Sequence, residues 1–260
     1  MFRRAWVLAA ALLCAASLDA QAGVAPRGPA LDHAAGQRTP LRFFLARGDN
    51  ACGPGCSAWI AAEGYFDLGS AQRLQAFVRR LGGRKVPIYF HSPGGIQAQA
   101  LAIGRMLRAR GMTAGVGRTV PVECAMSGAA CRGASRSGGA LAAELRTAEA
   151  TCSSACVYAL VGAAVRQVGA GARLGVHASK LVRIYRDGRV RAAAQDDLSP
   201  REQAHITSFN AELKSYLRAM GVDRSLFEAV MKVPPEQVRY LSSDEIARFG
   251  IERRHFEERR

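Results

Sequence analysis

Apolar residues recur along this chain with two different spacings, which predict strands and helices in turn. Compact apolar runs at 41–46, 58–64, 86–90 and 112–116 have the length and composition of buried strands. Around them, apolar residues recur every three or four positions, which predicts two helices that end at glycines. The apolar faces of these helices are formed by Leu74, Phe77, Val78 and Leu81, and by Ile96, Ala100, Ile103 and Leu107.

Two capping boxes mark helix starts in the last third of the chain. They are Ser199-Pro200-Arg201-Glu202, with proline at the first helical position, and Ser242-Ser243-Asp244-Glu245. The first predicted helix carries an apolar stripe and stops at Gly221; the stripe is Ile206, Phe209, Leu213, Leu217 and Met220. A hairpin is predicted at 181–190 around Asp187-Gly188.

The first 22 residues have the layout of a secretory signal peptide. Arg3 and Arg4 precede a short apolar stretch, and Ala20-Gln21-Ala22 forms a cleavage site. We therefore expect a periplasmic or secreted protein, with no transmembrane segment after cleavage. The predicted organisation is a flexible leader with a Cys52/Cys56 turn over 23–56, one domain over 57–252, and a charged tail over 253–260.

Six cysteines remain after cleavage, namely Cys52, Cys56, Cys124, Cys131, Cys152 and Cys156. An even number in an exported chain favours disulfides, and the absence of a C-x-x-C pair disfavours zinc. Cys52-Gly-Pro-Gly-Cys56 can close on itself. Cys152 and Cys156 stand one helical turn apart, where Cβ atoms are about 5–6 Å from each other and somewhat far for a bridge. We therefore predict that each pairs with Cys124 or Cys131.

The formal net charge is +15, and +14 after cleavage, because the signal peptide carries Arg3, Arg4 and Asp19. The basic residues are scattered, and no aromatic residues that could stack on bases lie among them. We interpret this charge as general background and predict no specific nucleic-acid partner.

The segment 151–179 carries the candidate chemistry. Ser153 and Ser154 occupy a small-residue turn before an apolar helical run, and His177 ends the next short strand. A serine at such a turn can present its hydroxyl to a cleft, and the free N–H groups of the first helical turn can bind developing negative charge. A histidine at the end of the neighbouring strand can act as general base. From this segment alone, a buried small-residue turn and a core histidine are the better interpretation.

A second stretch, Val86-Pro-Ile-Tyr-Phe-His-Ser-Pro-Gly-Gly95, ends in an SPGG turn before a helix. Together the two stretches resemble the ClpP family of serine peptidases, within the ClpP/crotonase superfamily. The shared order is SPGG, then a serine at a helix start, then Arg166, then His177 at a strand end. The segment 239–251, RYLSSDEIARFGI, is similar to the closing segment of that family, so the resemblance covers about 57–251.

The resemblance implies an α/β fold, a ClpP/crotonase-like spiral of β-strands with flanking helices in one domain. It further implies Ser154 as nucleophile, His177 as base, oxyanion donors at Gly94 and Ala155, and substrate binding at Gly95. A polypeptide substrate and a homo-oligomer follow from the same resemblance, with no cofactor and no metal.

The chain departs from that family in two places. A cysteine-containing insert, with a short helix predicted at 139–149, spans 118–150, where the family needs only a few residues. The family places an aspartate before the closing segment, whereas residues 231–238 contain only Glu236 as a carboxylate. Glu236 is therefore the tentative third catalytic residue. The alternatives for this third residue are Asp196, Asp197 and Asp223.

Other interpretations stay open. Ser153 is the second candidate nucleophile, and Lys180 permits a Ser–Lys variant. A catalytically inactive ClpP-like binding or scaffold protein of the cell envelope is the main alternative function. A crotonase-like enzyme for acyl-CoA would use the same turns without a serine nucleophile, but an exported protein meets little CoA.

Overall fold

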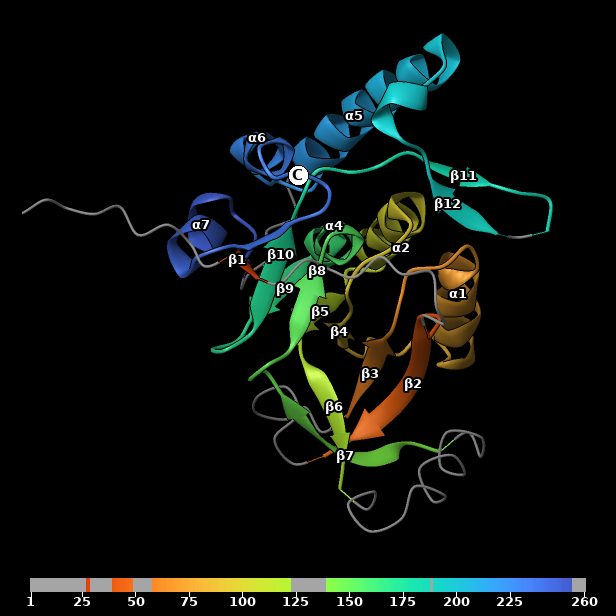
Figure 1. Cartoon of the computed structure of the whole chain (residues 1–260). Coiled ribbons are helices and arrows are strands. Elements are labelled where there is room, and N and C mark those ends of the chain that lie inside the picture. Colours follow the sequence, from red (N-terminus) through yellow and green to blue (C-terminus); the bar gives the residue numbers. More distant parts are fainter. Residues whose placement is uncertain (1–26, 29–38, 49–57, 123–138, 188, 254–260) are drawn as a thin grey trace, which may run out of the picture.

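The computed structural model describes residues 27–28, 39–48, 58–122, 139–187 and 189–253 (Figure 1). The Cys52/Cys56 turn, the rest of the predicted leader and most of the tail therefore lie outside the described residues, whereas 27–28 and 39–48, which we assigned to the leader, are described and contribute strands to the two sheets. Arg253, which we assigned to the tail, exchanges backbone hydrogen bonds with Arg166. None of the described helices is both long enough and apolar enough to cross a membrane.

A seven-stranded mixed sheet contains the strands that the apolar runs predict. Its order is β6 (Arg118–Pro121), β7 (Leu141–Arg146), β2 (Arg42–Arg47), β3 (Ala58–Glu63), β4 (Ile88–His91), β5 (Thr113–Val116) and β9 (Val165–Val168). Strands β3, β4, β5 and β9 run parallel to one another, and the β2–β3 and β6–β7 pairs are antiparallel. The α/β fold class is confirmed.

A second, four-stranded sheet adjoins the chain just after β4. Its order is β1 (Arg27–Gly28), β13 (Val238–Tyr240), β10 (Arg173–Val176) and β8 (Thr151–Ser153). Strands β8 and β10 are parallel, and a bridge between Ser92 and Cys152 joins this sheet to the chain that leaves β4. The SPGG turn and the serine turn therefore meet at the junction of the two sheets.

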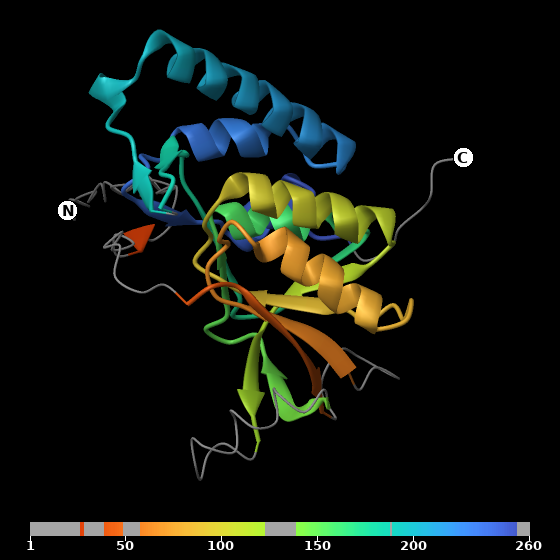
Figure 2. The ribbon, with the colours of Figure 1, turned by 90° about the vertical axis from the view of Figure 1, so that its right-hand side faces the viewer.

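Helices α1 (Ser70–Arg80), α2 (Gln97–Ala109) and α4 (Ala155–Gly162) cover the large sheet, and α5 (Pro200–Ala219) and α6 (Ser225–Met231) lie beyond α2 (Figure 2). All residues of α4 are buried. Helices α2 and α4 approach closely at two glycines, because a Cβ at position 162 would lie 2.2 Å from Cα of Gly104. The Tyr216 hydroxyl joins α5 to this layer by donating to the Tyr158 carbonyl at 2.7 Å.

Both predicted capping boxes form, at the starts of α5 and α7 (Ser243–Arg248). The predicted hairpin forms as β11 (Val182–Ile184) and β12 (Val190–Ala192), followed by the 3-10 turn η2 (Gln195–Asp197).

The helix predicted at 139–149 is wrong, because 141–146 forms β7 between β6 and β2. Residues 140–145 are mostly good helix formers. However, Leu141 and Ala143 are both buried, and their spacing of two residues is that of a strand with one face packed on the core. The insert thus contains β6 near its start and β7 near its end, and these two antiparallel strands extend the large sheet. Residues 123–138 between them lie outside the described ranges.

Candidate active site

Ser154 occupies a sharp strand-to-helix turn. Strand β8 ends at Ser153, helix α4 begins at Ala155, and Ser154 between them has φ 55° and ψ −122°. A positive φ is rare for a residue other than glycine and is found mostly where the surrounding structure enforces it. The backbone N–H of Ser154 donates to the Gly175 carbonyl at 2.8 Å, and its half-buried side chain makes no capping bond to α4. The hydroxyl is therefore not used by the helix it precedes.

The SPGG turn packs directly on this serine turn. Gly94 has φ 104°, and an alanine there would place its Cβ 2.7 Å from Cβ of Ser154 and 3.1 Å from the Ala155 nitrogen. Only glycine permits both the backbone conformation and this approach. The structure thus brings together Gly94, Ser154 and Ala155, as the sequence predicts. Gly95, the predicted substrate-binding residue, lies against the backbone of Phe66 instead, where a Cβ would stand 2.4 Å from the Phe66 carbonyl oxygen.

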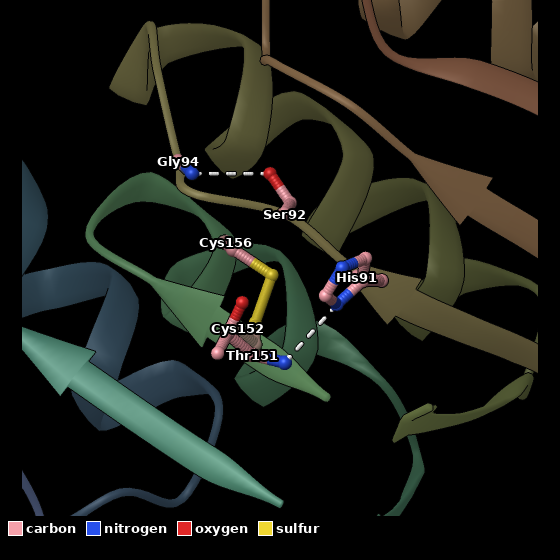
Figure 3. The surroundings of a disulfide bond; sticks show 6 residues. All are labelled: His91, Ser92, Gly94, Thr151, Cys152 and Cys156. Atoms are coloured by element: carbon pink, nitrogen blue, oxygen red, sulfur yellow. Dashed lines mark hydrogen bonds between the residues drawn. A yellow bond between two sulfur atoms is a disulfide. The ribbon is translucent and has the colours of Figure 1, made fainter. Parts of the chain in front are cut away.

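The two predicted oxyanion donors differ in their present hydrogen bonding. Ala155 is the first residue of α4, where the helix supplies no acceptor for its N–H. The N–H of Gly94, in contrast, donates to the buried Ser92 hydroxyl oxygen at 3.0 Å (Figure 3). Binding an oxyanion at Gly94 therefore requires this N–H to share or exchange its acceptor. Apart from the serine of SPGG itself, no sequence pattern indicates this hydrogen bond.

His177 follows β10, directly beside the serine turn. Gly175 pairs with Ser153 in the parallel β8–β10 ladder and accepts the Ser154 N–H, so His177 lies two residues beyond that contact. The half-buried imidazole holds Nδ1 2.8 Å from the Ala178 carbonyl oxygen. Because a carbonyl can only accept, Nδ1 carries the proton, and Nε2 of the neutral ring is the basic nitrogen. This is the tautomer that a general base needs.

Ser153 is an unsuitable nucleophile in this structure. It is only 2% exposed, and its hydroxyl faces Gly175, where an added Cβ would lie 2.5 Å from Oγ. The Ser153 hydroxyl therefore points into the β8–β10 pair, whereas Ser154 lies at the turn. Of the two candidates, the geometry favours Ser154.

The candidate third residues make identifiable contacts. The Glu236 carboxylate pairs with the Lys180 ammonium at 2.5 Å, so that both the tentative triad member and the Ser–Lys candidate take part in one ion pair. Asp223 accepts from the N–H and hydroxyl of Ser225 at the start of α6, and these hydrogen bonds lower its pKa. Asp196 and Asp197 lie exposed on η2. His177 Nδ1 contacts a backbone carbonyl, that of Ala178.

His91, the last residue of β4, has a structural role. Its Nδ1 accepts the Thr151 N–H at 3.2 Å, next to the disulfide (Figure 3). Burial, with a smaller contribution from the nearby Arg118 charge, lowers its pKa and keeps the ring neutral. His91 thereby fixes the start of β8, the strand that leads into the serine turn.

Arg166, which matched the family order, is buried away from the serine turn at the ends of three helices. Its guanidinium donates to the carbonyl oxygens of Val161 at 2.6 Å, Met220 at 3.0 Å and Gly250 at 3.0 Å. These three residues lie at the C-terminal ends of α4, α5 and α7. The side chain is 1% exposed, and burial, with the charges of Arg108 and Arg253, lowers its pKa to about 10. The guanidinium is therefore still charged at neutral pH, where the helix dipoles favour a cation. The position of Arg166 between the serine turn and His177 in the sequence does not indicate that it binds helix C-termini.

The predicted pairing of Cys152 and Cys156 with the insert is wrong, because these two cysteines form a disulfide with each other. The prediction placed both on one helix. In the structure Cys152 belongs to β8 and Cys156 to α4, and the turn at Ser154 brings their Cα atoms to 5.2 Å, within the range that a bridge needs. The other predicted disulfide residues, Cys52, Cys56, Cys124 and Cys131, lie outside the described residues.

No protein-family model matches the chain, and no curated protein matches it. Among solved structures, a mutant of the 1510-N membrane-bound stomatin-specific protease is similar with a TM-score of 0.45 and 13% identity, over 74% of this chain and 75% of that chain. Another mutant of the same protease, in complex with a substrate peptide, has a TM-score of 0.43 and 14% identity, over 74% and 71%. A mutant of ClpP1 from Listeria monocytogenes has a TM-score of 0.40 and 14% identity, over 73% and 83%. Similarity at this level assigns no residue roles.

Proposed function

We propose that this chain is an exported ClpP-like serine hydrolase, a peptidase, with Ser154 as nucleophile and His177 as base. The observation that carries the proposal is the turn at Ser154. Its positive φ places a serine between strand and helix, in contact with Gly94 and next to the free N–H of Ala155. Catalytic serines of other hydrolases stand on such strained strand-to-helix turns, because the turn exposes the hydroxyl and leaves helix N–H groups beside it.

The chemistry is acyl transfer in two steps. Ser154 Oγ attacks a peptide carbonyl, Nε2 of His177 accepts the hydroxyl proton, and the N–H groups of Ala155 and Gly94 bind the oxyanion. The imidazolium then protonates the leaving amine, and water, activated by the same nitrogen, releases the acyl group and restores Ser154. During this cycle Nδ1–H stays bonded to the Ala178 carbonyl, which fixes the tautomer.

The carbonyl that His177 Nδ1 contacts stabilises the imidazolium less than a carboxylate at the same position would. Loss of the orienting aspartate from a serine protease costs about 10⁴ in kcat, mostly through the wrong tautomer. Because the Ala178 carbonyl selects the correct tautomer, we expect a slow hydrolase whose turnover falls short of a full triad by less than that factor.

The cellular setting is part of the same proposal. The signal-like leader and the Cys152–Cys156 disulfide support an oxidising compartment, the periplasm or the exterior. The family resemblance supports a polypeptide substrate and a homo-oligomer. Light scattering on the mature protein tests the assembly, and a monomer mass at every concentration would contradict it.

One set of variants tests the chemistry. A fluorophosphonate probe should label folded wild type and Ser153→Ala, but neither Ser154→Ala nor His177→Ala. The losses in Ser154→Ala, His177→Ala and the double variant should be similar, because the two groups work as a unit. Labelling that disappears only in Ser153→Ala would contradict the assignment.

A catalytically inactive binding protein is the second candidate, and one observation favours it. The Gly94 N–H is already bound to Ser92 Oγ, as expected for a site in which no oxyanion forms. A well-folded wild type that neither reacts with the probe nor cleaves unfolded polypeptide would support this candidate and overturn the first.

A further inference from the structure

The disulfide between Cys152 and Cys156 straddles the candidate nucleophile. Cys152 lies two residues before Ser154 in β8, and Cys156 lies two residues after it in the first turn of α4. The bridge therefore closes a small ring whose midpoint is the residue with φ 55°. No residue of the ring can turn far without opening the bond or moving the helix.

Cys152 also lies between the other two parts of the site. On one side it pairs with Leu174 in β10, the strand that ends before His177. On the other side it forms a bridge with Ser92, whose hydroxyl accepts from Gly94, and Ser92 exchanges backbone hydrogen bonds with Thr151 and Ser153 (Figure 3). The sulfur–sulfur bond thus connects the helix that presents the Ala155 N–H to the strand that neighbours both the base and the SPGG turn.

Two features argue that this bridge does more than add stability. Its sequence separation is only 4, and short loops remove the least entropy from the unfolded chain. Both cysteines are 0% exposed, so a thiol in solution cannot reach the sulfur atoms while the turn is intact. The bond is therefore a permanent structural cross-link and not a disulfide that exchanges with thiols in solution.

We infer that the Cys152–Cys156 disulfide is a positioning element for Ser154. It holds the turn in its unusual backbone conformation and fixes the N-terminus of α4 against Gly94. Without the bridge, Ser154 can relax toward a common φ, which moves its hydroxyl and the Ala155 N–H relative to each other. This inference rests on the proposed function, since it assigns the disulfide a part in that reaction.

The test compares wild type with Cys152→Ala/Cys156→Ala. At a temperature where both are folded by circular dichroism, the second-order rate constant for fluorophosphonate labelling of the double variant should be about 10–100-fold lower, as for a displacement approaching 1 Å. On a peptide substrate the loss should be in kcat and not in KM, because the bridge contacts no substrate in this account.

Val161→Ala is the matched control, since it shortens another fully buried side chain near the far end of the same helix. It should lower the melting temperature but leave the labelling rate per folded molecule unchanged. A disulfide with a purely structural role would behave like Val161→Ala.

If the double variant does not fold, wild type refolded in dithiothreitol provides the comparison. Two electrons and two protons from the dithiol convert the bridge to two thiols, and the reagent becomes its cyclic disulfide. Differential alkylation with mass spectrometry identifies the molecules in which this bridge is open, and these should react more slowly than those in which it is closed.

The outcomes separate the two proposals. Equal labelling rates with and without the bridge would overturn the positioning role and leave the proposed function standing. No labelling of wild type would overturn both together. Slow labelling of the double variant with normal labelling of Val161→Ala supports both.

Discussion

At position 154 a serine adopts a conformation that costs about 1–3 kcal/mol for a residue with a side chain. Two neighbours maintain this conformation. The Gly175 carbonyl accepts the Ser154 N–H, and Gly94 packs on the Ser154 Cβ. Sequence reasoning found the serine and the glycine, because both residue types are required by the chemistry. It did not predict the φ value or the Gly94–Ser92 hydrogen bond, because these depend on contacts between distant segments.

Gly94→Ala tests this contact directly. The new Cβ would stand 2.7 Å from Cβ of Ser154 at φ 104°, so the SPGG turn or the serine turn must move. We expect probe labelling to fall at least about 100-fold, together with a loss of about 2–3 kcal/mol in the free energy of unfolding.

The control for that variant is Gly82→Ala. Gly82 also has a positive φ, of 60°, but an added Cβ meets no atom within 4 Å. This variant should lose about 1 kcal/mol of stability from backbone strain and keep the wild-type labelling rate. Equal labelling of the two variants would show that the Gly94 contact has no part in the reaction.

At the scale of elements, the β8–α4 junction was misread from the sequence. Spacing by four predicts one helical turn, whereas Cys152 is in a strand and Cys156 in a helix. The error at 141–146 has the opposite sense, because local helix propensity was overridden by pairing with β2 and β6. Both errors arise where tertiary contacts decide between two locally acceptable conformations.

The junction also depends on how α4 is anchored at its other end, where Arg166 binds the last carbonyls of three helices. Removing the guanidinium takes a donor from each of these carbonyls, of which that of Met220 keeps another side-chain donor, Arg108. This loss should exceed the desolvation regained by deleting a buried charge. Arg166→Met should therefore lose about 3 kcal/mol of unfolding free energy in urea denaturation. Arg146→Met, at an exposed pair with Glu144, should change it by less than about 1 kcal/mol. Similar losses in both variants would contradict the anchoring role.

Across the whole molecule, the order of strands, helices and turns in the sequence was a good guide to the fold. The SPGG turn and the serine turn are more than 50 residues apart, yet the structure joins them through the Ser92–Cys152 bridge. What the sequence could not supply is the group behind His177. Local chemistry points to Glu236, whose carboxylate pairs with Lys180, but it gives no sign that the Ala178 carbonyl lies 2.8 Å from Nδ1. Backbone acceptors have no sequence signature, since every residue carries one.

The central claim is that Ser154 is the residue that attacks a carbonyl or its analogue. Reaction of the mature, oxidised protein with a fluorophosphonate, followed by proteolysis and mass spectrometry, identifies the residue that carries the adduct. The account predicts one adduct per chain, on Ser154, whose formation requires His177. An adduct on Ser153 or elsewhere, or none on folded protein, would contradict it.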